Sequence, residues 1–131
     1  IIVASVQATA SQANVVAYTA SKGALLSLAR AMAIDEAAYG VRVNSVSPGS
    51  VDTPMLRTSA AEWSDGTPEG IERTIATWGT AHALGRVATI EELGAVISFL
   101  ASPRASFVTG ADIRVDGGLL ARVAAALPDK G

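Results

Sequence analysis

Short apolar runs rich in β-branched residues alternate with helical patterns along this chain, and that alternation limits the possible fold more than any other feature. Residues 1–6 (IIVASV), 41–47 (VRVNSVS) and 112–115 (DIRV) predict strands. Between the first two, residues 16–38 carry apolar side chains at three- and four-residue spacing, which predicts a helix. Strands that are linked through helices form right-handed crossovers and pair in parallel. The sequence therefore predicts an α/β fold with a parallel sheet of three strands and flanking helices.

The connection between the second and third predicted strands is long. Residues 49–66 are rich in Ser, Thr, Pro and Gly and predict an irregular loop, and 68–79 predict a short helix. Thr89 predicts the start of another helix, because its hydroxyl can accept hydrogen bonds from the first turn. Glu91 and Glu92 follow it, and their carboxylates suit the positive end of the helix dipole. An irregular stretch of this length inside a compact domain is usually functional.

The composition excludes several classes of function. The 131 residues carry a net charge of −2 with scattered Lys and Arg, whereas nucleic acids and anionic membranes favour a clustered cationic face. No apolar run approaches the roughly 18–20 residues of a membrane helix. The absence of cysteine rules out disulfides and thiolate metal sites, and it fits a cytoplasmic protein. We interpret His82, the only histidine, as a surface or lid residue, so we expect no metal site.

Three residues suggest acid–base chemistry. Tyr18 and Lys22 are four positions apart at the start of the long predicted helix, which places them on one face about one turn apart. A neighbouring ammonium group favours the phenolate form of tyrosine, which is the form that accepts a proton. Ser5 lies at the carboxyl end of the first predicted strand, and parallel sheets bind ligands beyond that end. Each residue alone also has an ordinary structural interpretation, as a packed ring, a solvated lysine or a strand-end serine.

The surrounding motifs give this combination more weight. The chain contains, in order, YTASKGAL at 18–25, VRVNSVSPGSVDTPM at 41–55, GR at 85–86 with EEL at 91–93, TG at 109–110 and VDGG at 115–118. This ordered set resembles the short-chain dehydrogenase/reductase family over residues 1 to about 120. The resemblance implies the C-terminal half of a doubly wound, Rossmann-like parallel sheet. It also implies one partial dinucleotide-binding domain over 1–131, with a lid insertion at about 52–88.

The resemblance implies a catalytic role for each of the three residues. Tyr18 would be the catalytic acid/base, and Ser5 would orient the substrate and stabilise charge on its oxygen. Lys22 would support Tyr18 and hydrogen-bond the ribose of the nicotinamide nucleotide. The implied activity is the NAD(P)-dependent interconversion of a secondary alcohol and a ketone by hydride transfer.

Four further residues would line the nicotinamide side of an NAD or NADP site. Pro48 and Gly49 would lie along the ring, while the backbone of Val51 and the hydroxyl of Thr53 would hold the carboxamide or phosphate region. Without the resemblance, Pro48-Gly49 is equally well explained as a turn. We interpret Asn44 as a structural residue that ties backbone segments together.

The family's Gly-rich phosphate-binding turn, its catalytic Asn and the residue that separates NAD from NADP have no counterpart in this sequence. We expect them in an N-terminal phosphate-binding half that is absent from this chain, so the activity is expected of the parent enzyme. The alternative is a catalytically silent fragment that serves as an assembly or interaction module. Members of the family commonly pair through the long helix and the last strand. The resemblance therefore implies a homo-oligomer, a dimer or a tetramer, that acts on a small-molecule alcohol or ketone.

Overall fold

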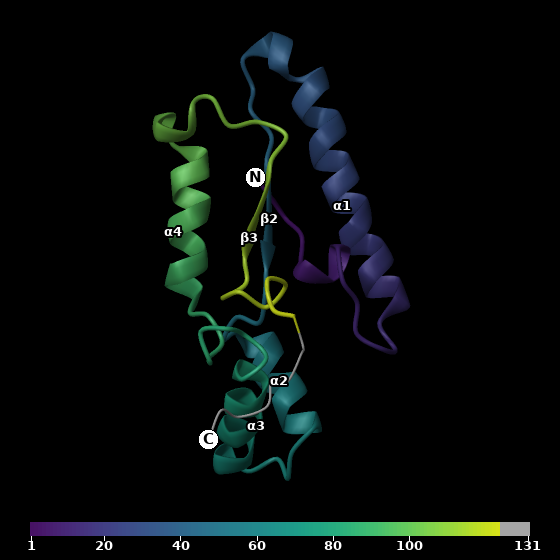
Figure 1. Ribbon diagram of the computed structural model, residues 1–131, viewed down its shortest axis with the longest axis vertical. Helices are drawn as coiled ribbons and strands as arrows, with labels where there is room; N and C mark the ends of the chain where they lie inside the picture. The colour runs from purple at the N-terminus through teal and green to yellow at the C-terminus, as the bar shows by residue number, and fades with distance from the viewer. Residues whose placement is uncertain (124–131) are drawn as a thin grey trace.

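The computed structural model describes residues 1–123, which form a three-stranded parallel sheet with helices on both faces. The strands are β1 (Ile2–Val3), β2 (Ser45–Pro48) and β3 (Asp112–Val115), in the order β1-β2-β3. Figure 1 shows α1 (Val16–Asp35) and α4 (Ile90–Ala101) on opposite sides of this sheet. The predicted parallel α/β fold is therefore confirmed.

The helix α1 packs on the sheet through small side chains. Ala29 and Ala33 are almost fully buried and form a cluster with Val43, against which Ile2 of β1 also packs. Because alanine adds little bulk, the helix backbone can lie close to the strands. The helix also contacts η1 (Val6–Ala8), the short 3₁₀ helix that follows β1. These contacts place α1 beside the carboxyl end of β1.

The opposite face of the sheet is covered by α4. Between α4 and the sheet, the buried side chains of Val46, Leu100 and Ala105 form an apolar cluster. Partly buried apolar side chains pack against this cluster: Leu93, Val96, Ile97, Val108, Ile113 and Val115. The helix begins with a capping box, in which Thr89 Oγ1 accepts from the Glu92 N–H and the Glu92 carboxylate accepts from the Thr89 N–H. The predicted helix start after Thr89 is confirmed, because both partners of this reciprocal cap are present in the sequence.

Asn44 ties β2 to the segment that enters β3. Its side chain is fully buried, and Nδ2 donates to the carbonyl oxygen of Val108 at 2.8 Å. Its Oδ1 accepts from the N–H of Ala111 at 3.0 Å. Both bonds go to backbone groups of the turn before β3 and so hold this turn against β2. Asn44 therefore has the structural role that its position predicts.

The helices α2 (Pro54–Glu62) and α3 (Pro68–Gly79) lie beyond the carboxyl ends of β2 and β3 (Figure 1). The structure confirms the helix predicted over 68–79. The prediction of an irregular loop over 49–66 is wrong for residues 54–62, which form α2. The Thr53 hydroxyl oxygen accepts from the Leu56 N–H at 3.2 Å, and the proline that follows Thr53 takes the first helical position, where no N–H is needed. These helix-starting signals outweigh the loop-like composition.

The first two strands are shorter than predicted. The run 1–6 is paired as a strand only at Ile2–Val3, because Ser5 caps η1 and the chain then turns away from the sheet. The strand predicted over 41–47 is formed by Ser45–Pro48. The predicted domain extends to residue 131, and its last residues, 124–131, lie outside the described part of the chain.

Candidate active site

Ser5 lies just beyond the end of β1 and is 7% exposed. Its Oγ accepts a hydrogen bond from the Gln7 N–H at 3.2 Å, and its carbonyl oxygen accepts from the Ala8 N–H at 3.0 Å. These contacts fix the residue but do not use the hydroxyl proton, since a serine hydroxyl can donate as well as accept. Ser5 can therefore donate to a ligand oxygen placed beyond the strand end.

Tyr18 and Lys22 occupy the first turns of α1. The Nζ of Lys22 donates to the carbonyl oxygen of Val3 at 3.3 Å, which anchors this lysine at the end of β1, two residues before Ser5. The same Nζ lies 5.5 Å from the centroid of the Tyr18 ring, within the range of a cation–π contact. Tyr18 is 43% exposed, so a ligand can reach its ring. The fold thus brings both side chains to the strand end that is followed by Ser5.

Beyond β2, the chain enters a turn that packs against His82. Gly49 has no room for a side chain, since a Cβ there would lie 2.8 Å from His82 Nε2 and 3.1 Å from the Cα of Asp116. The His82 side chain is buried, and its Nε2 accepts from the Ser50 N–H at 3.1 Å. The interpretation of His82 as a surface residue is therefore wrong. It lies in the segment predicted as the lid, but the ends of β2 and β3 cover its ring.

Val51 and Thr53 follow this turn. A parallel bridge joins Val51 to Ala88: the Ala88 N–H donates to the Ser50 carbonyl, and the Asp52 N–H donates to the Ala88 carbonyl, both at 2.9 Å. The hydrogen bonds of this bridge are made by the Ser50 carbonyl and the Asp52 N–H, on either side of Val51. The amide and carbonyl of Val51 itself therefore remain available to a ligand. The Thr53 oxygen caps α2, and its hydroxyl can still donate.

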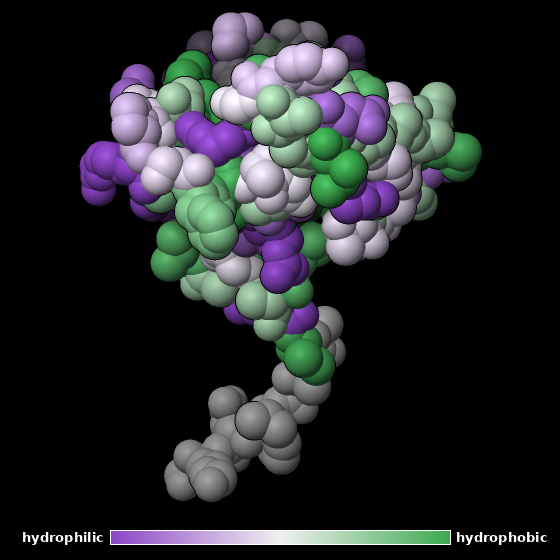
Figure 2. Space-filling view, turned by 90° about the horizontal axis from the view of Figure 1, so that it is seen from above, coloured by the Kyte–Doolittle hydropathy of each residue, from purple (hydrophilic) through white to green (hydrophobic). Residues whose placement is uncertain are grey.

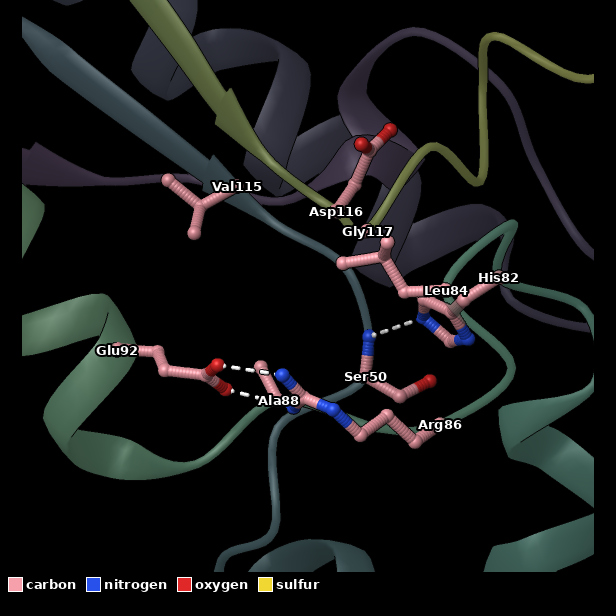
Figure 3. Close-up of a pocket in the computed structure, with 9 residues that line it drawn as sticks. All are labelled: Ser50, His82, Leu84, Arg86, Ala88, Glu92, Val115, Asp116 and Gly117. Carbon is pink, nitrogen blue, oxygen red and sulfur yellow. Dashed lines mark hydrogen bonds and ion pairs between the residues drawn. The ribbon is translucent and has the colours of Figure 1, made fainter.

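A cavity of about 110 Å³ lies between the strand ends and the start of α4 (Figure 3). Ser50 and His82 contribute to one side of it, and Arg86 and Glu92 to the other. The Arg86 guanidinium donates to both oxygens of Glu92, at 2.8 and 2.6 Å. These bonds, with a further one from the Thr89 amide, lower the pKa of Glu92 to about 2. The two charges are therefore paired with each other at the wall of the cavity.

The inserted segment carries a second ion-pair network, centred on Arg57 of α2. Its Nε and Nη2 donate to the Asp52 carboxylate at 2.7 Å each, and its Nη1 donates to Glu72 of α3 at 2.6 Å. The hydrogen bonds that Arg57 donates to Asp52, and then to Glu72, raise the pKa of Arg57 above its ordinary value. The groups are exposed, so each pair adds little stability. The network nevertheless links the residues before α2 to both helices.

Among residues 1–123, no helix is long and apolar enough to cross a membrane, and no group of three or more His, Cys, Asp or Glu side chains could hold a metal ion. Hydrophilic and hydrophobic residues are interspersed on the face seen in Figure 2. Trp63 is largely exposed after α2, and Trp78 is half-buried in α3.

Comparisons with known protein sequences give several long matches. The family described as enoyl-(acyl carrier protein) reductase matches residues 1–120. A short-chain dehydrogenase of Pyricularia oryzae is 42% identical over 118 residues, which cover 90% of this chain and 40% of that protein. The meso-2,3-butanediol dehydrogenase of Serratia marcescens is 47% identical over 104 residues, which cover 79% of this chain and 37% of that protein.

Solved structures resemble this fold closely. Ligand-free aldohexose dehydrogenase of Thermoplasma acidophilum superposes with a TM-score of 0.92 at 38% identity, covering 97% of this chain and 49% of that one. The L-sorbose reductase of Gluconobacter frateurii, solved with NADPH and L-sorbose, superposes with a TM-score of 0.86 at 27% identity. The match covers 92% of this chain and 46% of that one. The chain thus spans less than half the length of these relatives and matches the C-terminal part of their fold. Its sequence and its fold together show that it belongs to the short-chain dehydrogenase/reductase family.

Proposed function

We propose that the protein is an NAD(P)-dependent oxidoreductase that interconverts a secondary alcohol and a ketone, with Ser5, Tyr18 and Lys22 as its catalytic group. The main support is the hydrogen bond from Lys22 Nζ to the Val3 carbonyl at 3.3 Å. This bond brings the turn that carries Tyr18 and Lys22 to the strand end that carries Ser5. Because the chain spans less than half the length of its relatives, the activity is proposed for the whole protein rather than for these 131 residues alone.

In the proposed reaction, Tyr18 exchanges a proton with the substrate oxygen through its Oη. It gives the proton to a ketone during reduction and takes it from an alcohol during oxidation. The Ser5 hydroxyl donates to the same oxygen and stabilises the charge that develops there. Lys22 has three N–H donors, so after its bond to Val3 it can still bind ribose hydroxyls, and its charge favours the phenolate form of Tyr18. The bound nicotinamide supplies or takes up the hydride.

The residues after β2 fit the nicotinamide side of such a cofactor. Pro48 ends β2, and Gly49 follows it with no side chain, which suits a flat ring. The amide and carbonyl of Val51 are left out of the bridge to Ala88, and Thr53 retains a hydroxyl donor. These groups would hold the nicotinamide end of the cofactor, whereas NAD and NADP differ at the adenosine ribose, so both are candidates.

The proposed substrate is a small alcohol or ketone. Relatives are named for meso-2,3-butanediol, L-fucose and cis-4-hydroxycyclohexanecarboxylate, each of which carries a hydroxyl group. Residues 52–88 would form the lid over this substrate, since α2 and α3 lie beyond the strand ends. We also propose a cytoplasmic homo-oligomer that pairs through α1, where Leu28 and Ile34 are 47% and 78% exposed.

The first test is a fluorescence titration with NADH and with NADPH, followed by turnover assays on the three hydroxyl compounds. Tyr18→Phe should lower kcat by about 10²–10⁴-fold at an unchanged melting temperature. Tyr39→Phe is the matched control, because Tyr39 ends η2 (Ala37–Tyr39) with 79% exposure and should keep full turnover. Unchanged turnover in Tyr18→Phe would remove the proposed role of this phenol. Folded protein that binds neither cofactor would instead favour the catalytically silent module.

A further inference from the structure

His82 joins three parts of the molecule at the strand ends. Its backbone N–H donates to the Gly79 carbonyl at the end of α3, and its own carbonyl accepts from the Gly85 N–H. Its side chain packs against the residues that follow β2 and β3. A Cβ on Gly49 would lie 2.8 Å from Nε2, and one on Gly117 would lie 3.4 Å from the His82 Cβ. His82 therefore connects the inserted segment to the ends of both strands (Figure 3).

One hydrogen bond defines the protonation of this buried ring. The Ser50 N–H donates to Nε2 at 3.1 Å, so Nε2 carries a lone pair and the proton of the neutral imidazole sits on Nδ1. Nδ1 is buried and makes no hydrogen bond within residues 1–123. The contact with Ser50 is thus the polar interaction that orients the ring within this part of the chain.

Ser50 belongs to the turn that would face the nicotinamide. Its N–H is held by His82, and its carbonyl oxygen accepts from the Ala88 N–H at 2.9 Å. With both of these backbone groups fixed, the orientation of the next amide, that of Val51, is set as well. Loss of the contact with His82 would leave the peptide between Gly49 and Ser50 without its hydrogen bond and allow it to rotate.

We propose that His82 is a positioning residue of the cofactor site, which acts by accepting the Ser50 amide on Nε2 and so shapes the turn 48–51. The inference rests on the proposed function, because the shape of this turn affects turnover through the bound nicotinamide. In this role His82 touches neither substrate nor cofactor. A small backbone displacement at a cofactor contact is enough to weaken binding and turnover.

A matched pair of variants separates the acceptor of His82 from its packing. His82→Gln places Oε1 at the same number of bonds from Cβ as Nε2, whereas His82→Met has equal length without that acceptor. The Ser50 amide should exchange at least about tenfold faster in His82→Met and stay within about threefold of wild type in His82→Gln. The dissociation constant of the purified protein for NADH or NADPH should rise at least about tenfold in His82→Met and be restored in His82→Gln.

A ¹⁵N NMR spectrum of the wild type tests the tautomer without any variant, because the chain contains a single imidazole. A proton on Nδ1 alone is expected, and a proton on Nε2 would overturn the inference even if His82→Met failed to fold. Equal cofactor affinity in wild type, His82→Gln and His82→Met would refute the positioning role and leave the proposed function standing. A whole wild-type protein that binds neither cofactor would refute the proposed function, and the role of His82 in the cofactor site with it.

Discussion

Replacing Asn44 by alanine should destabilise the protein by an amount that its two hydrogen bonds define. The change leaves the Ala111 N–H without its side-chain partner, whereas the Val108 carbonyl loses one of two hydrogen bonds and keeps the one from Arg42 at 3.1 Å. An unpaired buried backbone group costs about 1–3 kcal/mol. Ala111 is only half-buried, so water can partly satisfy its N–H, and we take about 1–1.5 kcal/mol for it and about 0.5–1 kcal/mol for the hydrogen bond lost at Val108. The expected loss in the free energy of unfolding is therefore about 1.5–2.5 kcal/mol.

Urea unfolding followed by circular dichroism measures this loss. With a slope of about 1.5 kcal/mol per molar urea, the midpoint of Asn44→Ala should fall by about 1–1.7 M. Ser98→Ala, at an exposed position of α4, is the control and should stay within about 0.5 kcal/mol of wild type. A midpoint shift no larger than that of Ser98→Ala would refute the reasoning, because the Ala111 N–H would then find another partner at no cost and the second bond to Val108 would contribute nothing.

Two further changes test the strand ends and the start of α4. Glu92→Gln should lower the melting temperature at neutral pH. Because Arg86 lowers the pKa of Glu92 from 4.5 to about 2, the stabilisation from this carboxylate is complete above about pH 4.5 and is lost as the pH falls toward 2. Calorimetry should show the gap between wild type and variant closing over that range, and a constant gap would contradict the ion pair. Gly49→Ala should destabilise by about 1–3 kcal/mol in urea unfolding, since its Cβ would lie 2.8 Å from His82 Nε2. Gly23→Ala, with no atom within 4 Å of its Cβ in α1, should instead stabilise by up to about 1 kcal/mol, and equal effects of the two changes would rule out the clash.

The sequence predicted those parts of the fold that depend only on residues close together in the chain. The reciprocal cap of Thr89 and Glu92 needs only four consecutive residues, so the start of α4 could be read directly from them. The four-residue spacing of Tyr18 and Lys22 likewise places both on one side of α1, whatever the helix packs against. The parallel order of the strands followed from the helices between them.

Features that depend on distant partners could not be predicted in this way. His82 is buried because the ends of β2 and β3 close over it, and no periodic pattern around residue 82 indicates this. Arg42 is a second example. Its guanidinium donates to three carbonyl oxygens far along the chain: Leu100, Ser102 and Val108. A lone arginine before a strand carries no sequence signal for such contacts.

The bridge between Val51 and Ala88 also affects how this protein could change over time. Val51 follows the end of β2 and Ala88 precedes α4, and the bridge joins them, so the segment between these two residues is closed at its base. The length of this segment and the side chains that do not touch the strand ends can therefore vary without shifting the register of β2 and β3, whereas His82 contacts both strand ends and cannot. An exchange of α2 and α3 alone between homologues should therefore transplant their surface while the strand ends stay in place.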